Sequence, residues 1–145
     1  QAVDKAMTHL SATMKTERQV YDFLVKKGYT QAVIDYVLEK LNYYKFIDDF
    51  AYCRAYINSV NGKGRRAIEA DLIKRKAKCE AIDSVLQEFE EDADEAYAVL
   101  QKYLRGKEMN KANILKGCKY LLSKGFSYDT AHSATEKLAQ DNEDY

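Results

Sequence analysis

The sequence predicts an all-α fold, arranged as an elongated array of three tandem three-helix repeats. Three observations support this prediction. The chain of 145 residues contains no proline and only six glycines, a composition that suits helices joined by short loops better than sheets with many turns. Apolar residues recur at the i, i+3, i+4 and i+7 spacing of amphipathic helices. The pattern then returns at spacings of 48 and 49 residues.

The first repeat contains three expected helices. Gln1 to Thr13 carries apolar residues at helical spacing but has no capping residue at its start, so we expect the natural protein to begin earlier. Thr16 and Gln19 form a capping box that opens the second helix, and Gly28 ends it. Thr30 caps the third. The apolar positions of that third helix are Ile34, Val37, Leu38 and Leu41.

The end of the second helix identifies the later repeats. Residues 24–29 align with residues 72–77 and 121–126. We therefore expect helical repeats over residues 1–46, 47–91 and 92–145. A repeat of this period buries its small core against its neighbours, which predicts an elongated molecule with atypical ends. The weak third helix of the last repeat and an acidic, frayed tail over 141–145 fit such an end.

The apolar stripes predict a core in each repeat. The expected core residues are Val20, Leu24, Ile34 and Leu38, then Tyr56, Ile68, Leu72, Ile82 and Leu86, then Leu100, Cys118, Leu121 and Leu138. We expect the three cysteines, Cys53, Cys79 and Cys118, to be buried, inert thiols. Tyr52, Tyr97 and Tyr103 also lie on apolar stripes. Tyr29, Tyr43 and Tyr44 are candidates for the surface, either as interface or as ordinary solvated residues.

The sequence argues against several functional classes. The longest apolar runs are far shorter than a membrane span, and residues 1–10 lack the order of a signal peptide, so we expect a cytoplasmic protein with no membrane partner. His9 and His132 fall in different repeats, and Gly62-Lys63-Gly64 lacks the spacing of a nucleotide-binding loop. We therefore predict a protein without enzymatic activity, cofactor or metal.

Charge is segregated along the chain, although the formal net charge is zero. From Arg54 to Lys78 there are eight basic and two acidic residues, and from Cys79 to Ala96 there are eight acidic and no basic ones. The basic side chains could simply solvate a helix face, but around a glycine loop they could also meet phosphates or carboxylates. The candidate binding residues are Arg54, Lys63, Arg65, Arg66, Lys74 and Arg75.

Two carboxylates precede this basic stretch. Asp48 and Asp49 could be imagined as metal ligands, but acidic residues at the start of a helix more often cap its free N–H groups. We therefore assign both a structural capping role at the helix that follows them.

The middle of the chain resembles the RecX family. The resemblance rests on Asp48-Asp49, the run Tyr52 to Ile57, Gly62-Lys63-Gly64, Ile68 and Asp71-Leu72, and it extends outward through Leu10-Ser11, Lys15-Thr16-Glu17 and Lys27-Gly28-Tyr29. The chain departs from the family pattern at Thr13, Cys53, Arg65, Asp71 and Lys76; at the last of these the family often has a glycine.

The resemblance implies a non-enzymatic regulator of RecA recombinase. Such a protein would bind the groove of the RecA-DNA filament as a monomer and would inhibit recombinase, ATPase and coprotease activity in DNA repair, homologous recombination and the SOS response. Single- or double-stranded DNA is a further candidate partner. The alternative is a helical DNA-binding module that acts without RecA, because the basic second helix could enter a groove of DNA. The net charge of zero disfavours this alternative.

Overall fold

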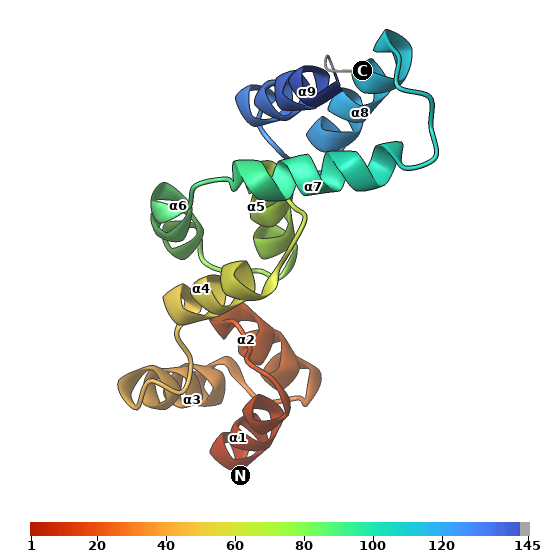
Figure 1. Cartoon of the computed structure of the whole chain (residues 1–145). Helices are drawn as coiled ribbons and strands as arrows, with labels where there is room; N and C mark the ends of the chain where they lie inside the picture. Colours follow the sequence, from red (N-terminus) through yellow and green to blue (C-terminus); the bar gives the residue numbers. More distant parts are fainter. Residues whose placement is uncertain (143–145) are drawn as a thin grey trace. The chain divides into compact units, whose positions relative to one another are not determined.

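The computed structural model describes residues 1–142 (Figure 1), and these residues form nine helices and no strand. The all-α prediction is confirmed. In chain order, the helices are α1 (Ala2–Ala12), α2 (Glu17–Lys26), α3 (Gln31–Tyr43), α4 (Asp49–Ser59), α5 (Arg65–Lys74), α6 (Cys79–Glu88), α7 (Ala93–Leu104), α8 (Lys111–Ser123) and α9 (Tyr128–Asn142). Part of the tail expected to fray, residues 143–145, lies outside the described residues.

Local capping signals place the helix ends. The Thr16 side chain accepts a hydrogen bond from the Gln19 backbone while the Gln19 side chain accepts one from the Thr16 backbone, so the predicted capping box is present. Thr30 caps α3 through the Val33 N–H, and Gly28 has the left-handed φ of +88° expected after α2. The first helix has no side-chain cap, as expected from Gln1.

The left-handed residue after the second helix recurs in each repeat. Gly28, Lys76 and Gly125 stand at equivalent positions and have φ values of +88°, +66° and +90°. Lys76 adopts this conformation without being a glycine, and its ammonium group lies 2.6 Å from the Asp22 carboxylate. The repeat therefore preserves a backbone conformation even where the residue type changes.

The chain divides into two compact units. The first contains residues 1–58 and 71–87, and the second contains residues 59–70 and those from 88 onward. Helix α5 is thus shared, with its first half in the second unit and its second half in the first. The repeat boundaries predicted at 46/47 and 91/92 stay a prediction.

Each unit has its own apolar core. In the first, α1, α2 and α3 pack around Val20, Leu24, Ile34, Val37 and Leu41, all at most 1% exposed. In the second, α7, α8 and α9 pack around an equivalent set that consists of Ala96, Leu100, Leu104, Leu121, Phe126, Ala131, Ala134 and Leu138. Burying such side chains is the main stabilising contribution to each unit.

Most of the predicted core is buried, with some corrections. Ile68, Leu72, Ile82 and Leu86 are buried as expected. Leu38, Tyr56 and Cys118 were expected in the core but are only half-buried, as are Tyr97 and Tyr103. Among the cysteines, Cys53 is buried, whereas Cys79 is exposed because it is the first residue of α6. Burial, followed by the Asp49 charge, raises the pKa of Cys53 to about 11.

Candidate partner-binding surface

The six candidate basic residues are divided between the two compact units. Arg54, Lys74 and Arg75 belong to the first, and Lys63, Arg65 and Arg66 belong to the second. The sequence also predicted that Arg54 lies close to the loop around Lys63. These two residues belong to different units, and this part of the prediction stays a prediction. Within each unit, the structure separates side chains that hold the fold together from those that face solvent.

Arg75 is engaged within the first unit. Its guanidinium donates a hydrogen bond to the Tyr52 hydroxyl at 3.1 Å and lies 4.4 Å from the centre of the Tyr56 ring. The Tyr52 hydrogen bond is the main cause of the raised pKa of Arg75. The Tyr56 hydroxyl donates in turn to Asp71, and burial together with this bond raises the pKa of Tyr56 to about 12. Arg75 therefore helps to join α4 to α5.

Arg65 is engaged within the second unit. Its guanidinium donates to the Phe89 carbonyl and lies 5.6 Å from the centre of the Phe89 ring. Its backbone N–H donates to the Glu91 carboxylate at 2.8 Å. Lys63 is half-buried. The glycine loop is also less open than expected, because Gly64 is buried. A Cβ atom added to Gly64 would lie 2.2 Å from the Phe126 nitrogen.

Arg54, Arg66 and Lys74 differ from these residues. All three side chains are exposed. Within residues 1–142, none of the three has a side-chain hydrogen bond, ion pair or ring contact. An exposed guanidinium or ammonium group of this kind keeps its donors available for an anionic partner.

Asp48 and Asp49 act at different helices. Asp48 accepts a hydrogen bond from the Ala51 N–H at 3.2 Å and so caps α4. Asp49, also assigned to α4 from the sequence, is only 5% exposed and faces other elements. Its carboxylate accepts from the Glu17 N–H at 2.9 Å and from the Lys78 N–H at 2.8 Å. The capping role at α4 that was predicted for Asp49 is therefore wrong, because Asp49 caps α2 and α6 instead.

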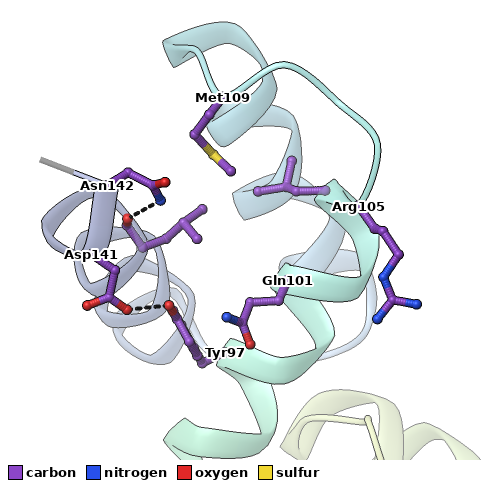
Figure 2. A pocket seen from close by; sticks show the side chains of 8 residues that line it. Tyr97, Gln101, Arg105, Met109, Asp141 and Asn142 are labelled. Atoms are coloured by element: carbon purple, nitrogen blue, oxygen red, sulfur yellow. Dashed lines mark hydrogen bonds between the residues drawn. The ribbon is translucent and has the colours of Figure 1, made fainter. Parts of the chain in front are cut away.

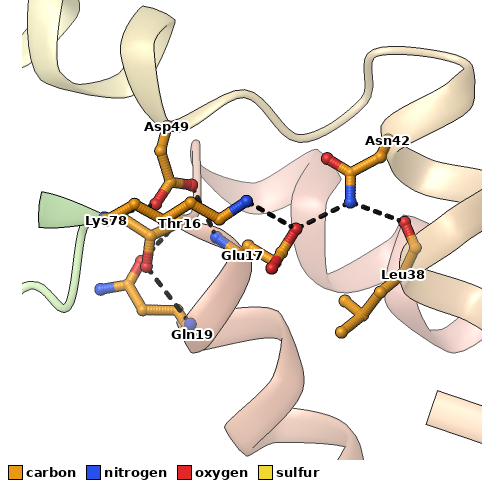
Figure 3. A network of polar contacts seen from close by, with 7 residues as sticks. All are labelled: Thr16, Glu17, Gln19, Leu38, Asn42, Asp49 and Lys78. Atoms are coloured by element: carbon orange, nitrogen blue, oxygen red, sulfur yellow. Dashed lines mark hydrogen bonds and ion pairs between the residues drawn. The ribbon is translucent and has the colours of Figure 1, made fainter. Parts of the chain in front are cut away.

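The Asp49 contacts belong to a polar network in the first unit (Figure 3). Thr16, buried at the start of α2, donates its hydroxyl to the Arg75 carbonyl at 3.0 Å. The Lys78 ammonium lies 3.2 Å from the Glu17 carboxylate, which also accepts from Asn42. These bonds join the start of α2 to the end of α5 and the start of α6. We name this arrangement the first junction.

The second unit contains an equivalent arrangement, the second junction. The Gly64 N–H donates to the Lys124 carbonyl at 2.9 Å, and the Arg66 N–H donates to the Gly125 carbonyl at 3.1 Å. These bonds join the start of α5 to the end of α8. Gly64 stands 48 residues after Thr16, and Lys124 stands 49 residues after Arg75, so the second junction repeats the first.

Glu91 takes the part of Asp49 in the second junction. Besides the Arg65 N–H, its carboxylate accepts from the Ser127 N–H at 3.0 Å and from the Thr130 hydroxyl at 2.7 Å. Burial of Glu91 opposes its ionisation, but the hydrogen bonds from Thr130, Arg65 and Ser127 outweigh this effect and lower the pKa of Glu91. Sequence reasoning counted Glu91 only as part of an acidic run. Its backbone partners, Arg65 and Ser127, stand 48 and 49 residues after Glu17 and Lys78, the partners of Asp49. This repeat spacing was the signal that could have pointed to a second carboxylate of the same kind.

A cavity of about 540 Å³ in the second unit is lined by Tyr97, Gln101, Arg105, Met109 and Asp141 among others (Figure 2). The Tyr97 hydroxyl donates to the Asp141 carboxylate there. Tyr97 and Asp141 are thus bonded to each other.

The tyrosines expected at the surface differ from one another. Tyr43 and Tyr44 are 77% and 59% exposed, and their rings meet edge to face at 5.0 Å. Tyr29, by contrast, is half-buried against the first core.

No group of three His, Cys, Asp or Glu side chains within the described residues could hold a metal ion. None of the helices described here is both long and apolar enough to span a membrane.

The repeated junctions define the class of this molecule: it is a helical-repeat protein assembled from three-helix units. Residues 2–41 match the family model described as "RecX, first three-helix domain". A crystal structure of RecX from Lactobacillus salivarius superimposes with a TM-score of 0.89 at 21% identity, covering 96% of this chain and 95% of that one, and so shows the same fold.

Curated relatives extend the similarity over nearly the whole sequence. "Regulatory protein RecX" of Bacillus cytotoxicus is 30% identical over 97% of this chain and 54% of its own length. The protein of the same name from Clostridium tetani is 31% identical over 92% of this chain and 65% of its own length. The chain therefore resembles the RecX family along nearly its whole length. It spans between half and two thirds of the length of these two relatives.

Proposed function

We propose that this chain is a regulatory protein that binds within the groove of the RecA-DNA filament and inhibits RecA. The activities limited would be strand exchange, ATP hydrolysis and coprotease action, in DNA repair and the SOS response. The names of the relatives support a regulatory role and not an enzymatic one. The proposal also takes the chain to act as a monomer in the cytoplasm.

One structural observation carries the proposal furthest. Arg54, Arg66 and Lys74 are exposed, and within the described residues their charged groups have no partner, whereas Arg65 and Arg75 are held by neighbouring side chains or carbonyls. A RecA-DNA filament offers phosphates and carboxylates to such cations. Several modest contacts made by one chain add to a substantial overall affinity.

Co-sedimentation with preformed RecA filaments tests the proposal. The chain should pellet with filaments assembled on single-stranded DNA and should lower their rate of ATP hydrolysis. Naked DNA at the same concentration is the control, and a shallow dependence of its weak binding on salt is expected. Failure to pellet at any ratio of chain to RecA would contradict the proposal. Tight, steeply salt-dependent binding to naked DNA would support the DNA-binding alternative instead.

A further inference from the structure

Residues 27–30, which we name the first-repeat edge, form the surface turn between α2 and α3. They are Lys27, Gly28, Tyr29 and Thr30. By the repeat spacing, they are equivalent to residues 75–78 and to residues 124–127. Residues 75–78 belong to the first junction and residues 124–127 to the second. The first-repeat edge is the third copy of the same turn.

The two junctions share two atoms of this turn, the carbonyl of its first residue and the N–H of its last residue. Backbone carbonyls at its start accept hydrogen bonds from the beginning of another helix: the Arg75 carbonyl does so in the first junction, and the carbonyls of Lys124 and Gly125 do so in the second. The N–H of the last residue of the turn, Lys78 or Ser127, donates to a carboxylate. A helix start together with a carboxylate is therefore what this turn binds twice within the chain.

The equivalent atoms of the first-repeat edge have no such partner. Among residues 1–142, nothing donates to the carbonyls of Lys27 or Gly28, and nothing accepts from the Thr30 N–H. A Cβ atom added at Gly28 would meet no atom within 4 Å, whereas at Gly125 it would lie 2.3 Å from the Ala67 nitrogen. The space that α5 occupies at the second junction is empty at Gly28.

The apolar residue of the turn shows the same difference. Ala77 is 9% exposed and Phe126 is 1% exposed, whereas Tyr29 is only half-buried. Lys27 within the first-repeat edge and Lys26 next to it are both exposed, and their charges would attract a carboxylate to the edge. The edge thus combines open hydrogen-bonding groups, an incompletely covered ring and positive charge.

We propose that the first-repeat edge is a docking surface for a partner protein, which inserts the N-terminal turn of a helix and a neighbouring carboxylate. The helix start donates to the carbonyls of Lys27 and Gly28, the carboxylate accepts from the Thr30 N–H, and the docked helix covers Tyr29. The inserted segment reproduces the contacts of the two internal junctions. This inference rests on the proposed function in one respect, since it takes the partner to be a protein of the filament.

The test replaces Gly28 with lysine, the residue that already occupies the equivalent left-handed position at Lys76. The matched control is Gly106→Lys, because Gly106 has a similar φ of +80° and equally open space around its Cβ position. Both variants carry the same backbone strain and the same added charge. Only Gly28→Lys places a side chain over the first-repeat edge.

We expect Gly28→Lys to weaken co-sedimentation with RecA filaments about tenfold or more, while Gly106→Lys binds as the wild type does. We also expect hydrogen exchange of the Thr30 amide to slow when filaments are added to the wild-type chain. If the wild type pellets and the two variants bind alike, the inference is overturned and the proposed function stands. If the wild type does not pellet at all, the proposed function fails.

Two further outcomes would assign the edge to another occupant and overturn the proposal. Sedimentation velocity of the chain alone would reveal a second copy there, if self-association occurs in the wild type and is lost in Gly28→Lys. Binding to naked oligothymidylate that is lost in Gly28→Lys and retained in Gly106→Lys would reveal a nucleic-acid site. Neither result is expected.

Discussion

The carboxylates of Asp49 and Glu91 make the same pair of backbone contacts in two different parts of the chain. Each accepts a hydrogen bond from the N–H of the first residue of one helix, Glu17 or Arg65, and another from the N–H just before a second helix, at Lys78 or Ser127. Free N–H groups at helix starts need acceptors, and a carboxylate is a strong one. A single acidic side chain thus fixes two helices at each junction.

The first prediction concerns Asp49. Replacing it with alanine leaves the N–H groups of Glu17 and Lys78 without an acceptor in a site that is largely shielded from water, so we expect a loss of about 2–4 kcal/mol in the free energy of unfolding. Urea denaturation followed by circular dichroism measures this loss. The control is Asp48→Ala, which removes an ordinary cap and should cost only about 1 kcal/mol. Equal losses in the two variants would contradict the two-helix role of Asp49.

The second prediction concerns the pH dependence of stability and Glu91. The folded state lowers the pKa of Glu91, so its contribution is complete above the unfolded value and is lost as the pH falls through the folded value. Glu91→Gln should therefore be less stable than the wild type near pH 7, and the difference should shrink towards pH 3. Urea midpoints across this range measure it. The control is Glu90→Gln, which changes an exposed neighbour and should alter the urea midpoint little near pH 7.

The third prediction concerns the contact of Gly125 with α5. Gly125→Ala places a methyl group 2.3 Å from the Ala67 nitrogen, in a backbone conformation that alanine disfavours. We expect a loss well above the roughly 1–2 kcal/mol that left-handed strain alone costs. Gly106→Ala carries that strain in open space, so it isolates the steric part of the effect. Melting temperatures that fall equally in both variants would refute the close packing.

The fourth prediction concerns the core of the shared helix α5. Leu72 is fully buried, and truncating it to alanine should cost about 2–5 kcal/mol. Its neighbour Ile73 is 59% exposed, so Ile73→Ala should change the free energy of unfolding by about 0.5 kcal/mol at most. A Leu72→Ala variant within that smaller range would place Leu72 outside the core.

Features that depend on neighbouring residues were predictable from the sequence. The capping box of Thr16 and Gln19 and the cap at Thr30 arise from side chains within one helical turn of their partners. Gly28 adopts its left-handed conformation at the helix end because it has no side chain. The burial of Ile68 and Leu72 follows from helical spacing alone. Because residues close together in the sequence determine these features, the sequence of one segment is enough to predict them.

The junctions could not be predicted in the same way. Asp49 binds N–H groups of residues 17 and 78, and every residue except proline offers such a group, so the partners leave no trace in residue type. Position 64 needs a glycine because the backbone at Phe126 lies against it, a contact between residues far apart in sequence. Sequence reasoning also grouped Arg65 with Arg66 because they are adjacent, although a helix points neighbouring side chains in different directions.

The last prediction separates those two arginines. The Arg65 guanidinium donates to the Phe89 carbonyl and lies over the Phe89 ring, and its backbone N–H is bonded to Glu91. A glutamate at position 65 would keep the backbone N–H but would lose both side-chain contacts with Phe89 and add a like charge beside Glu91. We therefore expect Arg65→Glu to lower the free energy of unfolding by about 2 kcal/mol or more.

Arg66→Glu should behave in the opposite way. Its side chain is exposed and makes no polar contact within the described residues, so the reversal should change stability by less than about 1 kcal/mol. If Arg66 contacts phosphates or carboxylates of the filament, the same change should weaken binding by about 2–5 kcal/mol, and adding Lys74→Glu should weaken it further. Filament titrations at two salt concentrations, beside circular dichroism melts, measure both effects. Unchanged affinity in a folded Arg66→Glu, Lys74→Glu variant would show that these cations only solvate the surface, and would leave the first-repeat edge as the main candidate for contact with the filament.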